Sequence, residues 1–129
     1  LETYTMKPIT QSRQHYLRFF WPNLLQDLVE AGIKRDYTLA FPKRSGFLLG
    51  TTLPVPAYRA DKDKEMPLLL IGPALMDQVF LKRGDEEGLK DEIKRLFRVV
   101  KPVGGILHYI WHNSTWDRLP LHLFTEEKA

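Results

Sequence analysis

The sequence predicts an α/β fold with a parallel sheet or barrel, because short apolar runs alternate with amphipathic helical segments along the chain. Two apolar runs, 68–71 and 105–111, read as buried strands, and the strongest helical pattern lies between them. The composition, 43% hydrophobic and 27% charged, is that of an ordinary globular protein. We therefore expect residues 1–129 to form a single unit without internal repeats.

The first half of the chain is expected to contain a helix, a strand and a long loop. Leucine and valine side chains fall on one face of 23–31, with Pro22 near the start and Gly32 as a C-terminal cap, which predicts a helix. The aromatic and β-branched run 37–41 predicts a strand. The prolines and alternating charges of 54–65 predict a loop.

The second half is expected to alternate strand, helix and strand. The compact apolar run 68–71 predicts a buried strand that ends at a Gly-Pro pair. Asp85 is predicted to open a helix that reaches Val100, since its apolar residues form one stripe and its acidic residues lie at the N-terminal end. Pro102 ends this helix, and 105–111 predicts a final buried strand.

Composition and charge exclude several classes of function. The net charge is +3, but the basic residues are scattered or interleaved with acids, so no nucleic-acid partner is expected. There is no cysteine, no phosphate-binding glycine motif and no apolar run near the ~18 residues that a membrane span needs. The segment 1–5 does not resemble a signal peptide, and without an initiator methionine we interpret the chain as mature, trimmed or excised from a longer protein.

His112 is the best candidate for general acid or base chemistry, because it stands at the carboxyl end of the predicted final strand. A capping or packing role is the alternative for such a histidine. Asp36 could stabilise an imidazolium and Arg13 could hold a carboxylate, although each residue taken alone is more typical of a solvated surface charge. His108 would lie about 13 Å from His112 at ~3.3 Å per residue, so these two histidines are not expected to share a metal ion.

An aromatic patch follows Arg13, formed by Tyr16, Phe19, Phe20 and Trp21. Aromatic faces stack on sugar rings and line ligand pockets, although such a cluster is also compatible with a plain core.

In their order and spacing, these segments resemble the carboxyl-terminal half of the catalytic domain of NodB-type polysaccharide deacetylases, a carbohydrate esterase superfamily, and in particular a bacterial branch of it. The residues that carry the resemblance are 12–19, 31–33, 36–39, 46–47, 50–51, 76–77, 104–106 and 111–113. The resemblance implies a partial irregular (β/α) barrel. It also implies hydrolysis of N- or O-acetyl groups on a sugar or polysaccharide with a divalent metal, usually zinc.

The resemblance also assigns roles to single residues. His112 matches the histidine that acts as general acid, Arg13 the arginine that orients the catalytic-base carboxylate, and Asp36 a carboxylate that supports the histidine. The substrate groove is expected to include His15, Tyr16, Trp111 and Asn113. Two positions depart from the pattern, since His15 stands where the superfamily has proline and Leu48 where the branch has arginine.

The metal ligands and the catalytic base of the superfamily precede the arginine motif, and residues 1–12 contain neither histidine nor aspartate. The resemblance therefore implies a deacetylase fragment that lacks its upstream metal-binding half, binds no metal alone and is inactive alone. A non-catalytic carbohydrate-binding or structural domain derived from this fold is the alternative. A barrel fragment exposes strand edges, so self-association is expected. The compartment stays open between the bacterial cytoplasm and periplasm.

Overall fold

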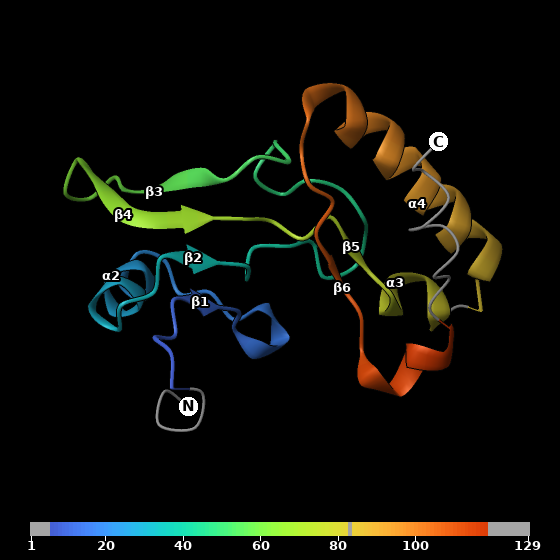
Figure 1. The fold of residues 1–129 in the computed structure, drawn as a ribbon, viewed down its shortest axis with the longest axis horizontal. Helices are drawn as coiled ribbons and strands as arrows, with labels where there is room; N and C mark the ends of the chain where they lie inside the picture. Colours follow the sequence, from blue (N-terminus) through green and yellow to red (C-terminus); the bar gives the residue numbers. More distant parts are fainter. Residues whose placement is uncertain (1–5, 83, 119–129) are drawn as a thin grey trace.

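A computed structural model of the chain describes residues 6–82 and 84–118. Its larger sheet has four strands in the order β1 (Gln11–Ser12), β2 (Arg35–Asp36), β4 (Lys64–Leu70) and β3 (Val55–Arg59). The first three strands run parallel, whereas β3 pairs with β4 in the antiparallel sense. The parallel strands β5 (Leu75–Met76) and β6 (Tyr109–Ile110) form a second sheet (Figure 1). The fold is mixed α/β, and the described residues form no closed barrel.

Helix α2 (Asn23–Glu30) covers the larger sheet and confirms the helix expected over 23–31. Its apolar stripe turns Leu25 and Leu28 into the core, where they are buried against side chains of β3 and β4. This cluster consists of Leu25, Leu28, Ile33, Ala57, Met66, Leu68 and Leu70. The predicted buried strand at 68–71 is largely confirmed, since β4 reaches Leu70.

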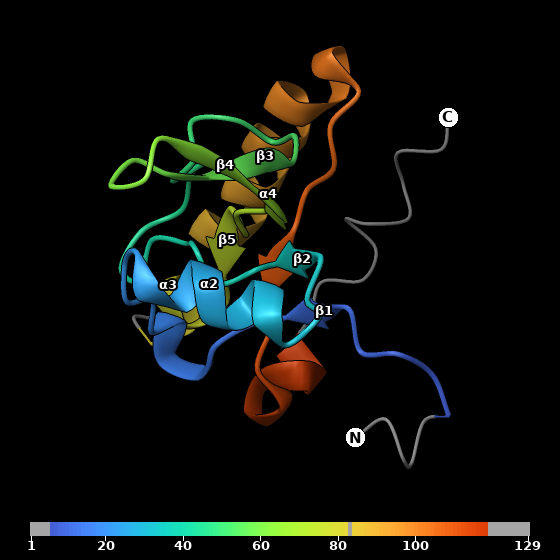
Figure 2. The ribbon, with the colours of Figure 1, turned by 90° about the vertical axis from the view of Figure 1, so that its left-hand side faces the viewer.

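A second core lies at the opposite end of the molecule, between the small sheet and helix α4 (Glu86–Val100). In Figure 2, viewed from the α2 end, α2 lies in front and α4 behind. The buried members of this cluster are Ala74, Leu75, Leu81, Leu89, Ile93 and Leu96. The helix begins as predicted, because the Asp85 carboxylate caps it by accepting a 2.9 Å hydrogen bond from the Gly88 N–H. Short helix α3 (Gln78–Leu81) precedes it.

The loop expected over 54–65 is wrong, because this segment contains β3, a turn and the start of β4. β3 lies at the sheet edge and its ladder shifts register between Pro56 and Tyr58, so the proline, which cannot donate a hydrogen bond, is tolerated. The charged residues of this segment form an ion pair at the turn between β3 and β4. Arg59 is buried, and its Nε donates to Asp61 at 2.8 Å.

The strand expected over 37–41 is also misplaced, because β2 ends at Asp36. The Asp36 carboxylate accepts a 2.9 Å hydrogen bond from the Thr38 N–H, and this local turn withdraws that donor from the sheet.

The final strand is shorter than the expected 105–111 and contains only Tyr109–Ile110. After the 3-10 helix η2 (Lys101–Val103), the Gly105 N–H donates to the Val100 carbonyl and thereby closes the end of α4. The Ile106 carbonyl accepts from the Thr52 hydroxyl at 2.8 Å. These backbone groups are therefore not available for a strand ladder.

Within 6–82 and 84–118, no helix has both the length and the apolar composition that crossing a membrane requires.

Candidate functional site

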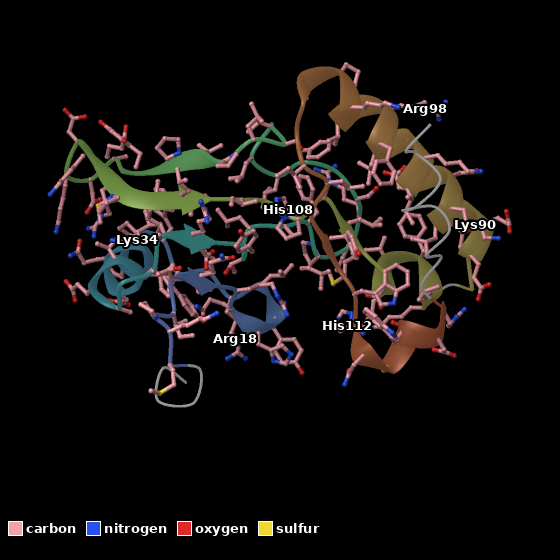
Figure 3. The ribbon with its side chains drawn as sticks, in the orientation of Figure 1. Arg18, Lys34, Lys90, Arg98, His108 and His112 are labelled. Carbon is pink, nitrogen blue, oxygen red and sulfur yellow. The ribbon has the colours of Figure 1, made fainter. Side chains whose placement is uncertain are left out.

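The site is built where β5 and β6 end side by side. The two strands are parallel and pair Met76 with Ile110, so the residues that follow each strand emerge at the same sheet edge. Asp77 follows β5 and His112 follows β6 by two residues. Their side chains meet, with 2.6 Å between the His112 Nδ1 and the Asp77 Oδ1. Figure 3 shows His112 below β6, beside the short 3-10 helix η3 (Asn113–Arg118).

Asp77 is fully buried and accepts hydrogen bonds on both carboxylate oxygens. Besides the His112 imidazole, its Oδ1 takes the Gln78 N–H at 2.8 Å. Its Oδ2 takes the His112 N–H at 3.1 Å and the Thr115 hydroxyl. Burial raises the pKa of Asp77, but the hydrogen bonds from Thr115, His112 and Gln78 outweigh it, so the net pKa lies below the ordinary value. Asp77 is therefore an anion at neutral pH.

The ionised carboxylate fixes the orientation of the imidazole. A carboxylate only accepts hydrogen bonds, so the hydrogen in the short contact belongs to the His112 Nδ1. The side chain of His112 is 33% exposed, and among the described residues its Nε2 has no hydrogen-bond partner. His112 borders a cavity of about 490 Å³. An imidazole held in this way can exchange a proton at Nε2 with a bound ligand.

Arg13 borders the same cavity, and the backbone on both sides of it is held in place. The Ser12 hydroxyl donates to the Asp36 Oδ2 at 2.6 Å, and the Gln14 N–H donates to the Thr38 hydroxyl at 2.9 Å. That hydroxyl in turn donates to Asp36 at 3.0 Å. Arg13 thus projects from a fixed backbone. Its own side chain is exposed and makes no ion pair or hydrogen bond within the described parts of the chain.

The expected support of His112 by Asp36 is corrected by these contacts. Asp36 is buried with 1% exposure, and its hydrogen bonds join it to Ser12 and Thr38, whereas the imidazole binds Asp77. Asp36 therefore stabilises the segment that carries Arg13. It does not contact the imidazole of His112 through a hydrogen bond. Arg13 and His112, both predicted from the sequence, border one cavity.

His15 and Tyr16 border this cavity too, from the 3-10 helix η1 (His15–Leu17) that follows Arg13. Their ring centroids lie 4.2 Å apart, and Tyr16 is 77% exposed. Tyr16 and Leu17 have φ angles of 58° and 54°, a left-handed conformation that is unfavourable for bulky residues. Strained backbone of this kind is concentrated at binding and catalytic sites.

The other two residues expected in the substrate groove lie elsewhere. Trp111 borders a neighbouring cavity of about 400 Å³, which it shares with Arg13 and His108. Asn113 is exposed at the start of η3 and borders neither cavity. His108 packs its ring 5.3 Å from that of Tyr37, and burial lowers the pKa of His108.

The donor set that a resident metal needs is not found in this part of the protein. Among the described residues, no group of three or more histidine, cysteine, aspartate or glutamate side chains is close enough to hold an ion. His108 and His112 stand at opposite ends of β6 (Figure 3). The residues present therefore do not fit the metal that the resemblance implies.

Three residues of the site are not predicted from the sequence, namely Asp77 and Thr115, which hold His112 in place, and Lys82, which borders the His112 cavity. In the sequence, Asp77 stands out only within 76–77, one of the segments that carry the resemblance. Its partner depends on the pairing of two strands of two residues each, which leave no periodic signal in the sequence.

No family model, curated protein or solved structure matches the chain.

Proposed function

We propose that this chain is the carboxyl-terminal part of a metal-dependent carbohydrate deacetylase, which hydrolyses N- or O-acetyl groups on a sugar or polysaccharide. The observation that carries the proposal is the pairing of His112 with the buried Asp77 at a cavity that Arg13 also borders. The resemblance to NodB-type enzymes suggests the reaction. The contact between His112 and Asp77, beside a cavity, supports the role of general acid that the resemblance assigns to His112.

Removal of an acetyl group requires proton transfer to the group that leaves. Water adds to the acetyl carbon, and the resulting tetrahedral species breaks its bond to the sugar nitrogen or oxygen, which must gain a proton. In its protonated form, His112 can donate this proton from Nε2. The Asp77 carboxylate accepts the hydrogen of the His112 Nδ1 and so fixes the orientation of a ring whose residue borders the cavity.

Arg13 is suited to hold a carboxylate, since its guanidinium forms two parallel hydrogen bonds with such a group. The resemblance assigns this carboxylate to the catalytic base. No aspartate or glutamate borders the His112 cavity among the described residues. The proposal therefore places the base and the metal ligands in other parts of the protein. In this superfamily the metal supplies a polarised water molecule.

A non-catalytic carbohydrate-binding domain is the second candidate, and a specific observation favours it. Three aromatic side chains of one short stretch are strongly exposed, namely Tyr16 at 77%, Phe20 at 72% and Trp21 at 53%. Exposed aromatic faces stack on sugar rings without any chemistry.

The decisive experiment uses a version of the protein extended upstream, supplied with zinc, and measures acetate release from acetylated chito-oligosaccharides. We expect release, and we expect His112→Ala to lower it by roughly 100-fold or more, as for loss of a general acid. His108→Gln is the matched control, because this histidine packs on Tyr37 and does not border the His112 cavity. Activity that survives His112→Ala would refute the assigned role.

Zinc calorimetry on the short chain and the extended protein separates the two candidates further. Tight binding by the extended protein alone is expected, whereas tight binding by the 129-residue chain would contradict a ligand set outside it. Sugar binding without acetate release, weakened by Tyr16→Ala, would support the non-catalytic candidate instead.

A further inference from the structure

We propose that Thr115 is a positioning residue, whose hydroxyl fixes the Asp77 carboxylate so that Asp77 in turn holds the His112 imidazole toward the cavity. The inference rests on the proposed function for its catalytic meaning. The hydrogen bonds that support the inference lie within the described residues of this chain, so they can be tested without metal or substrate.

The backbone of Thr115 is fixed on both sides of its side chain. Its N–H donates to the His112 carbonyl at 3.1 Å, and its carbonyl accepts the Trp111 Nε1–H at 2.8 Å. Thr115 also departs from helical geometry within η3, with φ −129° and ψ 19°. The hydroxyl is therefore held beside Asp77 by contacts that do not involve the hydroxyl itself.

The hydroxyl has two acceptors within reach but only one proton to donate. It contacts the Asp77 Oδ2 and lies 3.1 Å from the His112 carbonyl. An ionised carboxylate is the stronger acceptor, so the proton goes to Asp77. The Oδ2 is then fixed by two donors, the Thr115 hydroxyl and the His112 N–H. This arrangement leaves the Oδ1 facing the His112 Nδ1, and without the hydroxyl the Oδ2 keeps only one of its two donors, the His112 N–H.

Other charged groups around the pair must be considered, because they also influence the titration of Asp77. Helix α3, which Asp77 caps, carries no titratable side chain. The titratable groups on the cavity wall and on η3 are Arg13, His15, Tyr16, Lys82, Asp117 and Arg118. Arg118 is paired with Glu86. Within the described residues, hydrogen bonds to the Asp77 carboxylate come only from Thr115, His112 and Gln78.

The test is nuclear magnetic resonance on the 129-residue chain with Thr115→Val, which keeps the branched side-chain shape and replaces the hydroxyl with a methyl group. We expect the carboxyl-carbon titration of Asp77 to move to higher pH. We also expect exchange of the His112 Nδ1 hydrogen to accelerate roughly tenfold, the equivalent of one lost hydrogen bond to a charged group. Thr115→Ser, which keeps the hydroxyl, should restore both values. Ser114→Ala, at an exposed neighbouring position, should change neither.

Wild-type titration and exchange in a folded Thr115→Val protein would overturn the inference, as would failure of Thr115→Ser to restore them. If the valine variant does not fold, the comparison of Thr115→Ser with Thr115→Gly keeps the test decisive, since only serine supplies the hydroxyl. In the extended enzyme, Thr115→Val should lower kcat about tenfold with little change in KM. Absence of acetate release from every version would refute the proposed function and leave the resonance results standing.

Discussion

Asp77→Asn should destabilise the protein in a way that depends on pH. The substitution removes a buried anion while leaving the side-chain size almost unchanged. The pKa of Asp77 is held below its ordinary value, since the hydrogen bonds from Thr115 and His112 outweigh the effect of burial. The folded protein thus releases this proton more readily than the unfolded chain, whose aspartates titrate near pH ~3.9. The carboxylate contributes stability above that pH, and the contribution is lost as pH falls through the folded-state pKa.

The size of the effect follows from the donors around Asp77. One carboxylate oxygen accepts from His112 Nδ1 and Gln78, and the other from His112 N–H and Thr115. An asparagine amide keeps one acceptor oxygen, so two donors lose the carboxylate as their acceptor, of which the Thr115 hydroxyl can turn to the His112 carbonyl. One or two donors left unsatisfied in a buried site, at about 1–3 kcal/mol each, give a loss of about 1–6 kcal/mol at neutral pH.

The assay is urea denaturation of both proteins over a pH series from neutral to acid. The difference in unfolding free energy should be largest at neutral pH and should narrow at low pH, where wild-type Asp77 is protonated as well. Asp27→Asn, at an exposed position of α2, is the matched control and should change stability by no more than about 0.5 kcal/mol. A difference that is constant across the pH series, or equal to that of the control, would refute the reasoning.

Two further predictions concern the fold. Asp85→Ala removes the N-terminal cap of α4, so thermal unfolding should show a loss of about 1 kcal/mol, and an unchanged midpoint would contradict the capping role. Strands β1 and β3 are the edge strands of the larger sheet within the described residues, so sedimentation velocity should show association that grows with concentration. A clean monomer at high concentration would count against a truncated barrel.

The two longer helices, α2 and α4, could be predicted from the sequence because their signals are local. The apolar stripe and the capping Asp85 define α4 within one stretch of chain, and α2 ends before Gly32, whose φ of 80° suits a residue without a side chain. Neither signal depends on which segment packs against the helix.

The strands were harder to predict because their existence depends on a partner. The hairpin of β3 and β4 was missed because Pro56 and the charged turn are typical of loops, and only the edge position of β3 makes them compatible with a strand. Residues 37–41 look like a strand but leave the ladder, because the Asp36 side chain captures the Thr38 N–H. Such competition between side chain and sheet has no signature in hydrophobic pattern.

Only part of the site could be predicted, because its other part depends on which strands pair. His112 and Arg13 could be found because each lies at the edge of a recognisable segment, and the structure places both at one cavity. The carboxylate partner of His112 was misassigned to Asp36. The true partner, Asp77, is fixed by the parallel pairing of β5 with β6, which sequence spacing does not reveal.

Asp36 and Asp77 carry out parallel tasks, and together they limit the chemistry of this cavity. Each follows or ends a short parallel strand, is buried, and accepts both a backbone N–H and a threonine hydroxyl. Asp36 fixes the backbone around Arg13, and Asp77 fixes the ring of His112. Because their oxygens are engaged in these contacts, neither carboxylate is free to activate a water molecule. A hydrolase that uses this cavity with a carboxylate base must therefore draw that carboxylate from a residue other than Asp36 and Asp77, and Arg13, exposed at the cavity wall, is placed to receive it.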